Sequence, residues 1–212
     1  SEYKSVNIDG TLNLAQQAIS AGVKRFIYLS SIKVNGEETA YEKSFKPDDN
    51  PSPIDEYGKS KFEAERQLIK ISSKAEMDFV IIRPVIVYGP SVKGNLLSLL
   101  AWISKGLPLP LGSVKNLRDF VSVLNLADLI LLCLKHPSAA NQIFLVSDDK
   151  PISTTYLINS ISAGLKKSII NIPISSAFLK VFFKLLNKND ISLKLLSSLR
   201  VDISKTKKVL DW

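Results

Sequence analysis

Tyr57 and Lys61 stand four residues apart in the segment 55–65, DEYGKSKFEAE, and this spacing could support acid–base chemistry. Residues four apart share one face of a helix, so the ammonium would lie beside the phenol. A nearby cation stabilises the phenolate and lowers the phenol pKa from about 10, as a tyrosine base near neutral pH requires. A chain with 6 tyrosines and many lysines also contains such pairs by chance, so the spacing alone carries little weight.

Two serines precede this pair at the end of an apolar run. Ser30 and Ser31 close RFIYLSS (25–31), which is typical of a buried parallel strand. Ligands of open α/β sheets bind at the carboxyl ends of such strands. The Ser31 hydroxyl could therefore share a substrate oxygen with Tyr57, although a serine that simply ends a strand is the plainer interpretation of Ser31 alone.

Helices and strands alternate around these residues. In the first ninety residues, apolar spacing predicts a helix over 2–21 that ends at Gly22, a strand over 25–31, a helix from about Ser52 through Lys70 and a strand over 78–89. This order indicates an α/β sheet with right-handed crossovers. From Gly94 onward helices prevail, and they are predicted over 94–106, 125–136, 153–163, 175–187 and 203–210, with one further strand over 141–146.

The nine glycines form no Gly-x-Gly-x-x-Gly cluster. A dinucleotide fold normally receives the pyrophosphate on such a turn, between its first strand and first helix. Either the chain binds no nucleotide, or its first βαβ units lie outside this sequence.

Composition narrows the functional classes. The chain has 212 residues, of which 45% are hydrophobic and 23% charged, as in a soluble globular protein. Its net charge of +8 is spread along the sequence without a basic tract, which argues against a nucleic-acid partner. The single cysteine, Cys133, suits a reducing compartment, and we expect a cytoplasmic protein. His136 is the one histidine, so we expect no metal site.

Residues 174–186 form the most apolar stretch, and Lys180 and Lys184 interrupt it. We expect no membrane span, because no stretch reaches the roughly 20 apolar residues that a crossing helix needs. The pattern favours contact with a cap or a partner over contact with a membrane surface.

Seven blocks occur in order between Ser5 and Trp212: VNIDGTLNL, FIYLSSIKVNG, YGKSK, RPVIVYGP, GN followed by a helix, RDFVSVLNLADLI and DISKTKKVLDW. Together they resemble the extended short-chain dehydrogenase/reductases, in the nucleotide-sugar epimerase/dehydratase branch. SSIKVNG and GLPLPLGSVKN are most similar to the bacterial 4-keto reductases that make UDP-N-acetylquinovosamine for surface polysaccharide. Asn35 departs from the family, which usually has tyrosine there.

The resemblance implies four catalytic positions. Ser31 would polarise the C4 oxygen of a sugar, and Tyr57 would move the C4 proton while hydride passes to or from a nicotinamide. Lys61 would hold the nicotinamide ribose and lower the tyrosine pKa. Asn7 resembles the family's helix asparagine near the proton relay.

It also implies binding positions. Ser30, Pro84, Tyr57 and Lys61 would lie beside the cofactor. Asn95 and Arg118 would hold the uridine diphosphate, a role that suits a guanidinium chemically. An ion pair with Asp119 is the alternative for Arg118.

We therefore expect an α/β protein, the C-terminal part of a Rossmann-like parallel sheet with an interleaved helical substrate-binding cap. The expected sheet domain comprises 1–93 and 118–147, and the expected cap comprises 94–117 and 148–212. Two missing βαβ units would need roughly 80–100 residues. We expect the chain to be the remaining two-thirds of such an enzyme, inactive alone because the turn that grips the pyrophosphate is absent.

The implied activity is an NAD(P)-dependent epimerisation or 4-keto reduction of a UDP-sugar, with a homodimer formed through the helices at 2–21 and 54–70. The alternative is a non-catalytic module of the same fold that senses NAD(P) or contacts a protein.

Overall fold

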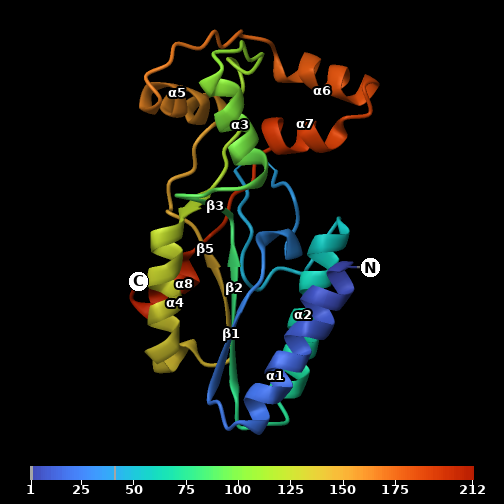
Figure 1. The fold of residues 1–212 in the computed structure, drawn as a ribbon, viewed down its shortest axis with the longest axis vertical. Coiled ribbons are helices and arrows are strands. Elements are labelled where there is room, and N and C mark those ends of the chain that lie inside the picture. Colours follow the sequence, from blue (N-terminus) through green and yellow to red (C-terminus); the bar gives the residue numbers. More distant parts are fainter. Residues whose placement is uncertain (1, 41) are drawn as a thin grey trace.

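Three parallel strands form the main sheet of this computed structural model, which describes residues 2–40 and 42–212 (Figure 1). Strand β2 (Asp78–Pro84) lies between β1 (Arg25–Leu29) and β5 (Gln142–Val146). All three strands consist mostly of apolar residues, as expected where both faces of a parallel sheet are covered.

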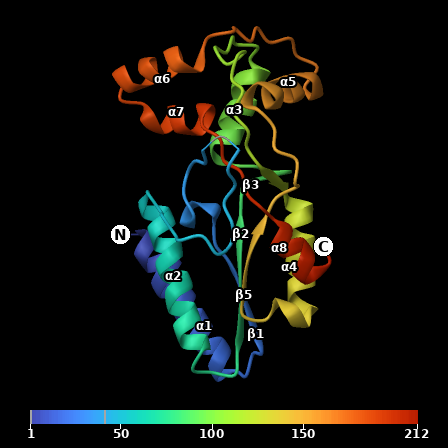
Figure 2. The same ribbon diagram turned by 180° about the vertical axis from the view of Figure 1, so that it is seen from behind.

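Helices cover both faces of this sheet (Figures 1 and 2). A π-helical segment, η1 (Lys4–Gly10), continues into α1 (Thr11–Ser20), which lies with α2 (Glu56–Ser72) on one face. Helices α4 (Val123–Lys135) and α8 (Ser204–Leu210) lie on the other.

Alternation along the strands divides the core accordingly. Tyr28 and its register partner Ile81 pack with Leu68 of α2, whereas Ile82 and its partner Phe144 pack on the opposite face. Successive side chains of a strand point to opposite faces, so a short apolar strand supplies both core layers.

A smaller sheet and four helices form the other end of the molecule. Strands β3 (Ile86–Tyr88) and β4 (Phe120–Ser122) pair in parallel. Beyond them lie α3 (Gly94–Ser104), α5 (Thr154–Gly164), α6 (Ser176–Leu185) and α7 (Asn189–Leu196), as both views show. Their apolar residues form a separate cluster that includes Ile103, Ile158, Leu179 and Leu196. Short 3₁₀ helices are formed by η2 (Ile32–Val34) and η3 (Pro137–Ala139).

Most predicted elements are confirmed, with three differences. The strand expected over 78–89 is interrupted at Val85, and its second half pairs with β4, which the sequence did not predict. The helix expected from Ser52 begins at Glu56, because the Asp55 carboxylate caps it by accepting the Gly58 amide at 2.7 Å. Helix α7 was not predicted, because 189–196 is short and lies next to the helix predicted over 175–187.

The end of the chain returns to the main sheet. Leu199, Val201, Ile203 and Leu210 pack in the cluster that contains Ile82. The expected cap segment 148–212 therefore includes residues that belong to the core of the sheet. The rest of the expected division into two domains stays a prediction.

Candidate active site

The two serines follow β1 at its carboxyl end. Ser31 caps η2, since its Oγ accepts the Lys33 amide at 3.3 Å. Ser30 is buried, and its hydroxyl has no hydrogen-bond partner among the described residues. One serine thus has its hydroxyl oriented by the next turn of the chain, and the other retains hydrogen-bonding capacity.

The first turn of α2 presses against the segment that carries Ser31. A Cβ at Gly58 would lie 2.9 Å from the Lys33 carbonyl oxygen, so a larger residue would force the helix away. Glycine in YGKSK therefore permits Tyr57, its neighbour, to lie close to Ser31. This close approach, rather than the Tyr–Lys spacing alone, makes the segment distinctive.

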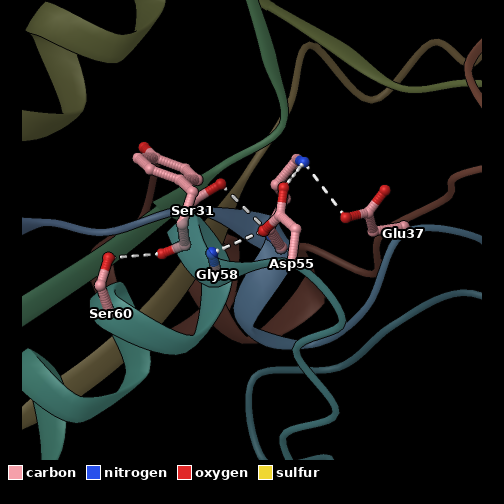
Figure 3. A network of polar contacts seen from close by, with 7 residues as sticks. Ser31, Glu37, Asp55, Gly58 and Ser60 are labelled. Atoms are coloured by element: carbon pink, nitrogen blue, oxygen red, sulfur yellow. Dashed lines mark hydrogen bonds and ion pairs between the residues drawn. The ribbon is translucent and has the colours of Figure 1, made fainter. Parts of the chain in front are cut away.

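Lys33 joins the two elements through the carboxylates of Asp55 and Glu37, which Figure 3 labels. Its ammonium forms ion pairs with Asp55, the cap of α2, and with Glu37, at 3.1 Å from Glu37 Oε1. Burial disfavours the ammonium, but these two carboxylates raise the pKa of Lys33 above its usual value. Asp55, whose pKa is lowered in turn despite partial burial, thus holds both the Gly58 amide and Lys33.

The Tyr57 phenol is half-buried among these groups. Burial raises its pKa above the usual value, while the charge of Lys33 and hydrogen bonding from the Ser31 side chain act to lower it. Burial outweighs these lowering effects, and Lys33 is a cation that sequence spacing did not indicate. Desolvation raises the pKa because an anionic phenolate loses more hydration than a neutral phenol. The expected contribution of Lys61 to this pKa stays a prediction.

Lys61 lies on the Tyr57 side of α2 as predicted. Its Nζ donates to the Leu29 carbonyl at 2.9 Å, and it lies 4.7 Å from the Tyr28 ring centre and 5.9 Å from that of Tyr57. Burial lowers the pKa of Lys61, and the negative charge of Glu65 opposes that shift. The ammonium is thus fixed at the end of β1, beside the phenol ring.

Asn7 reaches the same helix turn indirectly. Its Nδ2 donates to Ser60 Oγ at 3.0 Å, and that hydroxyl donates to the Tyr57 carbonyl at 2.8 Å. The side chain of Asn7 therefore ties the N-terminal helix to the turn that carries the tyrosine.

A buried ion pair connects α2 to strand β2 of the main sheet. Arg83 Nε and Nη2 lie 2.9 and 2.6 Å from the two carboxylate oxygens of Glu65, and Nη1 donates to Asn35 Oδ1 at 3.0 Å. Asn35 also donates to the Lys46 carbonyl at 2.9 Å. The departure from the family at position 35 thus has a structural role here, because a buried amide satisfies Arg83.

A cavity of about 330 Å³ opens next to Ser31. Four predicted site residues line it: Ser31, Pro84, Asn95 and Arg118. Of the other predicted residues, Tyr57, Lys61, Asn7 and Ser30 lie outside this lining. The structure brings Ser31, Tyr57 and Lys61 together at the end of β1, and it places the expected uridine diphosphate ligands along the adjoining cavity.

Arg118 is the deepest charge in the cavity wall. It is buried, and its Nη1 donates to the carbonyls of Leu193 and Ser197 at 3.3 and 3.0 Å. Its Nε has no partner among the described residues. Burial lowers the pKa of Arg118 to about 10, which leaves a cation at neutral pH. Asp119 accepts the Val201 amide at 2.9 Å, rather than pairing with Arg118.

Sequence reasoning missed several charged groups. Lys33 and Glu37 line the cavity together with Lys93 and Lys194. The ion pair of Lys33 with Glu37 extends beyond the end of η2, so the helical four-residue rule did not indicate it. Lys194 comes from the unpredicted α7, and no local pattern indicates that this helix reaches the cavity.

A parallel α/β sheet with serine at one strand end, and tyrosine and lysine in the next helix, defines the class of short-chain dehydrogenase/reductase-like proteins. The sequence profile of the NAD dependent epimerase/dehydratase family matches residues 1–147. The chain belongs to this family, and the expected Rossmann-like fold class is confirmed.

Two curated relatives illustrate the similarity. UDP-glucose 4-epimerase of Vibrio cholerae is 51% identical over 211 residues, covering 99% of this chain and 64% of the relative. N-acetyl-alpha-D-glucosaminyl-diphospho-ditrans,octacis-undecaprenol 4-epimerase of Escherichia coli O157:H7 is 31% identical over 171 residues, covering 79% of this chain and 50% of the relative. The chain thus spans less than two thirds of the length of either relative.

Solved structures share the fold. UDP-glucose 4-epimerase of Thermotoga maritima, crystallised with UDP-glucose, superposes with a TM-score of 0.76 at 22% identity, covering 99% of this chain and 64% of that one. UDP-glucuronic acid 4-epimerase of Bacillus cereus, in complex with NAD, gives 0.76 at 18% identity, covering 97% and 61%.

Proposed function

We propose that the protein is an NAD(P)-dependent nucleotide-sugar epimerase or 4-keto reductase that acts at C4 of a UDP-hexose. The observation that carries this proposal is the meeting of the Ser31 hydroxyl and the Tyr57 phenol beside a cavity whose wall contains Arg118. The 51% identity to a UDP-glucose 4-epimerase supports the substrate class.

Tyr57 would act as the acid and base at the C4 oxygen. Its raised pKa favours the protonated phenol, which can donate a proton to a C4 carbonyl oxygen during reduction. In the oxidative direction the phenolate must form, and the nearby Lys33 stabilises it. Ser31 would hold the same oxygen by hydrogen bonding, with its own Oγ oriented by the Lys33 amide.

The residues present fit one part of a nicotinamide dinucleotide. An ammonium has three donors, and Lys61 gives one to the Leu29 carbonyl, so donors remain for ribose hydroxyls. The buried Ser30 hydroxyl, which lacks a partner among the described residues, offers a further hydrogen bond at this strand end. When bound, the nicotinamide would supply the one function that these side chains lack, exchange of a hydride with the sugar carbon.

The cavity provides the positive charge that a diphosphate needs. Lys33, Lys93, Arg118 and Lys194 line it against a single carboxylate, that of Glu37. Arg118 Nε would donate to a diphosphate oxygen, and the exposed amide of Asn95 could contact the same group.

The decisive experiment uses the protein expressed from its complete gene. UDP-sugars are supplied with NAD(P)H, and both the sugar products and the cofactor are measured over time. Net consumption of cofactor excludes a pure epimerase, whereas isomerisation without consumption excludes a reductase. Tyr57→Phe should lower kcat by about 10²- to 10⁴-fold, because the proton donor is lost.

Tyr156→Phe is the matched control, since Tyr156 is exposed on α5 away from Ser31. Turnover that survives Tyr57→Phe would refute this mechanism and favour the alternative, a non-catalytic module that senses NAD(P) or contacts a protein.

Three wider roles belong to the same proposal. The name of the Escherichia coli relative describes a sugar diphosphate on undecaprenol, which supports a role in polysaccharide precursor synthesis. A homodimer would form through α1 and α2, where Val6 of η1 and Leu14 expose apolar side chains. Sedimentation equilibrium of Leu14→Glu tests this.

The cytoplasmic location expected from the single cysteine stays a prediction.

A further inference from the structure

Helix α6 carries a continuous apolar stripe on its outward face. Its members recur at the three- and four-residue intervals that align on one side of a helix. They are between 46% and 78% exposed: Phe178, Val181, Phe182, Leu185 and the adjoining Leu186. Both overall views place α6 at the outer end of the molecule, above α7 (Figures 1 and 2).

The opposite face fixes this helix to the protein. Leu179 is buried, and Phe183 packs with it against the cluster that contains Ile103 and Leu196. The Ser175 hydroxyl caps the helix by accepting the Phe178 amide at 3.3 Å. The stripe is therefore a stable outer surface of a packed helix, since a separate set of side chains already provides the core contacts.

The charged residues of α6 have one sign. Lys180 and Lys184 are exposed four residues apart and border the stripe on one side, and the exposed Lys188 follows as the N-cap of α7. The sequence contains no aspartate or glutamate between Asp149 and Asp190, whereas it contains Lys166 and Lys167 in the exposed segment that leads to α6.

We propose that α6 docks on the surface of an anionic lipid bilayer, with its apolar stripe in the headgroup region and its lysines on the acidic lipids. A helix with large apolar residues on one face and lysines beside them lies in the membrane interface. Lysine suits this place, because its long aliphatic stem packs on apolar surface while the ammonium stays in water. No helix among the described residues is long and apolar enough to cross a membrane, so α6 would lie on the bilayer.

The charges favour a bilayer over a second copy of the chain. Pairing two copies through the stripe would bring the lysines of both α6 helices together, and the sequence has no aspartate or glutamate between Asp149 and Asp190 to neutralise them. An acidic lipid surface neutralises all of these lysines at once. The side chains of the stripe form no hydrogen bonds. Apolar lipid chains can cover such a surface, because they form no hydrogen bonds either.

Docking would bring the candidate site near the membrane. Helix α7 packs directly against α6, and its residues Leu193, Lys194 and Leu195 line the cavity beside Ser31. The bilayer would thus lie close to α7, which forms part of the wall of the cavity in which a diphosphate is proposed to bind. The docking proposal itself rests on the surface of α6 and does not depend on the proposed reaction.

The test measures vesicle binding of the protein expressed from its complete gene. Vesicles of phosphatidylcholine alone are compared with vesicles that also contain phosphatidylglycerol, by co-sedimentation at low and high salt. We expect the protein to bind the anionic vesicles, and we expect high salt to weaken this binding. Leu185→Glu should weaken it by about tenfold or more, because a charge enters the apolar face. Lys184→Gln should weaken it about fivefold, the share of one lysine at an anionic surface.

Leu124→Glu is the matched control. Leu124 of α4 is 77% exposed and Leu185 is 78% exposed, but α4 contains Asp128 and no row of lysines. We expect Leu124→Glu to bind like the unsubstituted protein, and circular dichroism melts should show all three variants folded.

Three outcomes would overturn the proposal. The protein could fail to bind anionic vesicles, or Leu124→Glu could weaken binding as much as Leu185→Glu. In the third outcome, vesicle binding would be absent and sedimentation equilibrium would show a dimer that Leu185→Glu dissociates. That result would assign the stripe to contact with a second copy of the chain.

Discussion

Two buried arginines occupy different electrostatic surroundings. Arg83, 2% exposed, forms a bidentate ion pair with Glu65 between the sheet and α2. Arg118, 7% exposed, lies in the cavity wall, and donates only to backbone carbonyls among the described residues. One cation is neutralised by the protein, whereas the other is desolvated without a carboxylate partner.

This difference is the one expected between a structural charge, that of Arg83, and the proposed ligand-binding charge of Arg118. Burying an ion costs several kcal/mol unless a partner compensates it. Glu65 compensates Arg83, and the pair fixes the helix that carries Tyr57 and Lys61. Burial lowers the pKa of Arg118, and the negative charge of Glu37 opposes that shift only in part. Binding an anion would remove that penalty, so we expect substitutions of Arg83 to affect folding and substitutions of Arg118 to affect binding.

The largest expected effect is on the folding of Arg83→Met. This variant leaves the Glu65 carboxylate buried without its partner, and it should lower the free energy of unfolding by about 3–5 kcal/mol. Urea denaturation followed by circular dichroism measures the change.

The double variant Arg83→Met, Glu65→Leu tests the cause. Removing both charges should recover most of the loss, because a buried pair is often replaceable by apolar residues of similar volume. If the single variant cost less than about 1 kcal/mol, the range of a surface pair, the ion pair would not be what holds α2.

Arg118→Met should affect binding instead. Loss of a charge-assisted hydrogen bond costs about 1.5–3 kcal/mol, so the affinity for UDP should fall roughly 10- to 150-fold. Its unfolding free energy should change less than that of Arg83→Met, because no carboxylate is left unpaired. Isothermal titration calorimetry with UDP gives the first quantity and urea denaturation the second.

Lys105→Met provides the control for lost positive charge, since Lys105 is exposed at the end of α3, outside the cavity lining. Equal losses of UDP affinity in the two variants would mean that overall charge, rather than the place of Arg118, attracts the ligand.

The arrangement of the sheet was largely predictable because its signals are local. A short apolar run such as RFIYL is typical of a strand in a parallel sheet, and apolar spacing specified most helices. Spacing also predicted the face that Lys61 shares with Tyr57. The helix start was misassigned because Ser52 and Asp55 both suit an N-cap, and the contact of Gly58 with the Lys33 carbonyl favours the later start.

The electrostatics of the candidate site were not predictable in the same way. Lys33 acts on Tyr57 from 24 positions upstream, through a fold that brings η2 against the start of α2. Burial of the phenol, which outweighs the charges, depends on Tyr3 and other residues that pack around it. Sequence spacing contains neither distance nor depth, so it could not indicate that Lys33 acts on Tyr57 or that the phenol is half-buried.

The smallest expected effect is a shift in the titration of Tyr57. Among the groups that face it, Lys33 favours the phenolate, while Asp55 and Tyr3 disfavour it; Tyr28 and Lys61 lie beside its ring. Lys33→Met removes the cation and leaves Asp55 unpaired, and both changes raise the phenol pKa. The pKa of the Tyr57 phenol should therefore rise further. NMR of tyrosine labelled at Cζ, assigned with Tyr57→Phe, measures it directly.

Lys33→Arg and Lys59→Met are the controls for this measurement. Arginine keeps the positive charge between Asp55 and Glu37, so the titration should stay near that of the unsubstituted protein. Lys59 is also on the first turns of α2, but it is exposed and pairs with Glu56, so its removal should change stability by less than about 1 kcal/mol and leave the phenol unchanged. A shift in Lys59→Met as large as in Lys33→Met would mean that the total charge of the helix sets the pKa. A shift in Lys33→Met alone would assign that effect to the ammonium of Lys33, which pairs with Asp55 and Glu37.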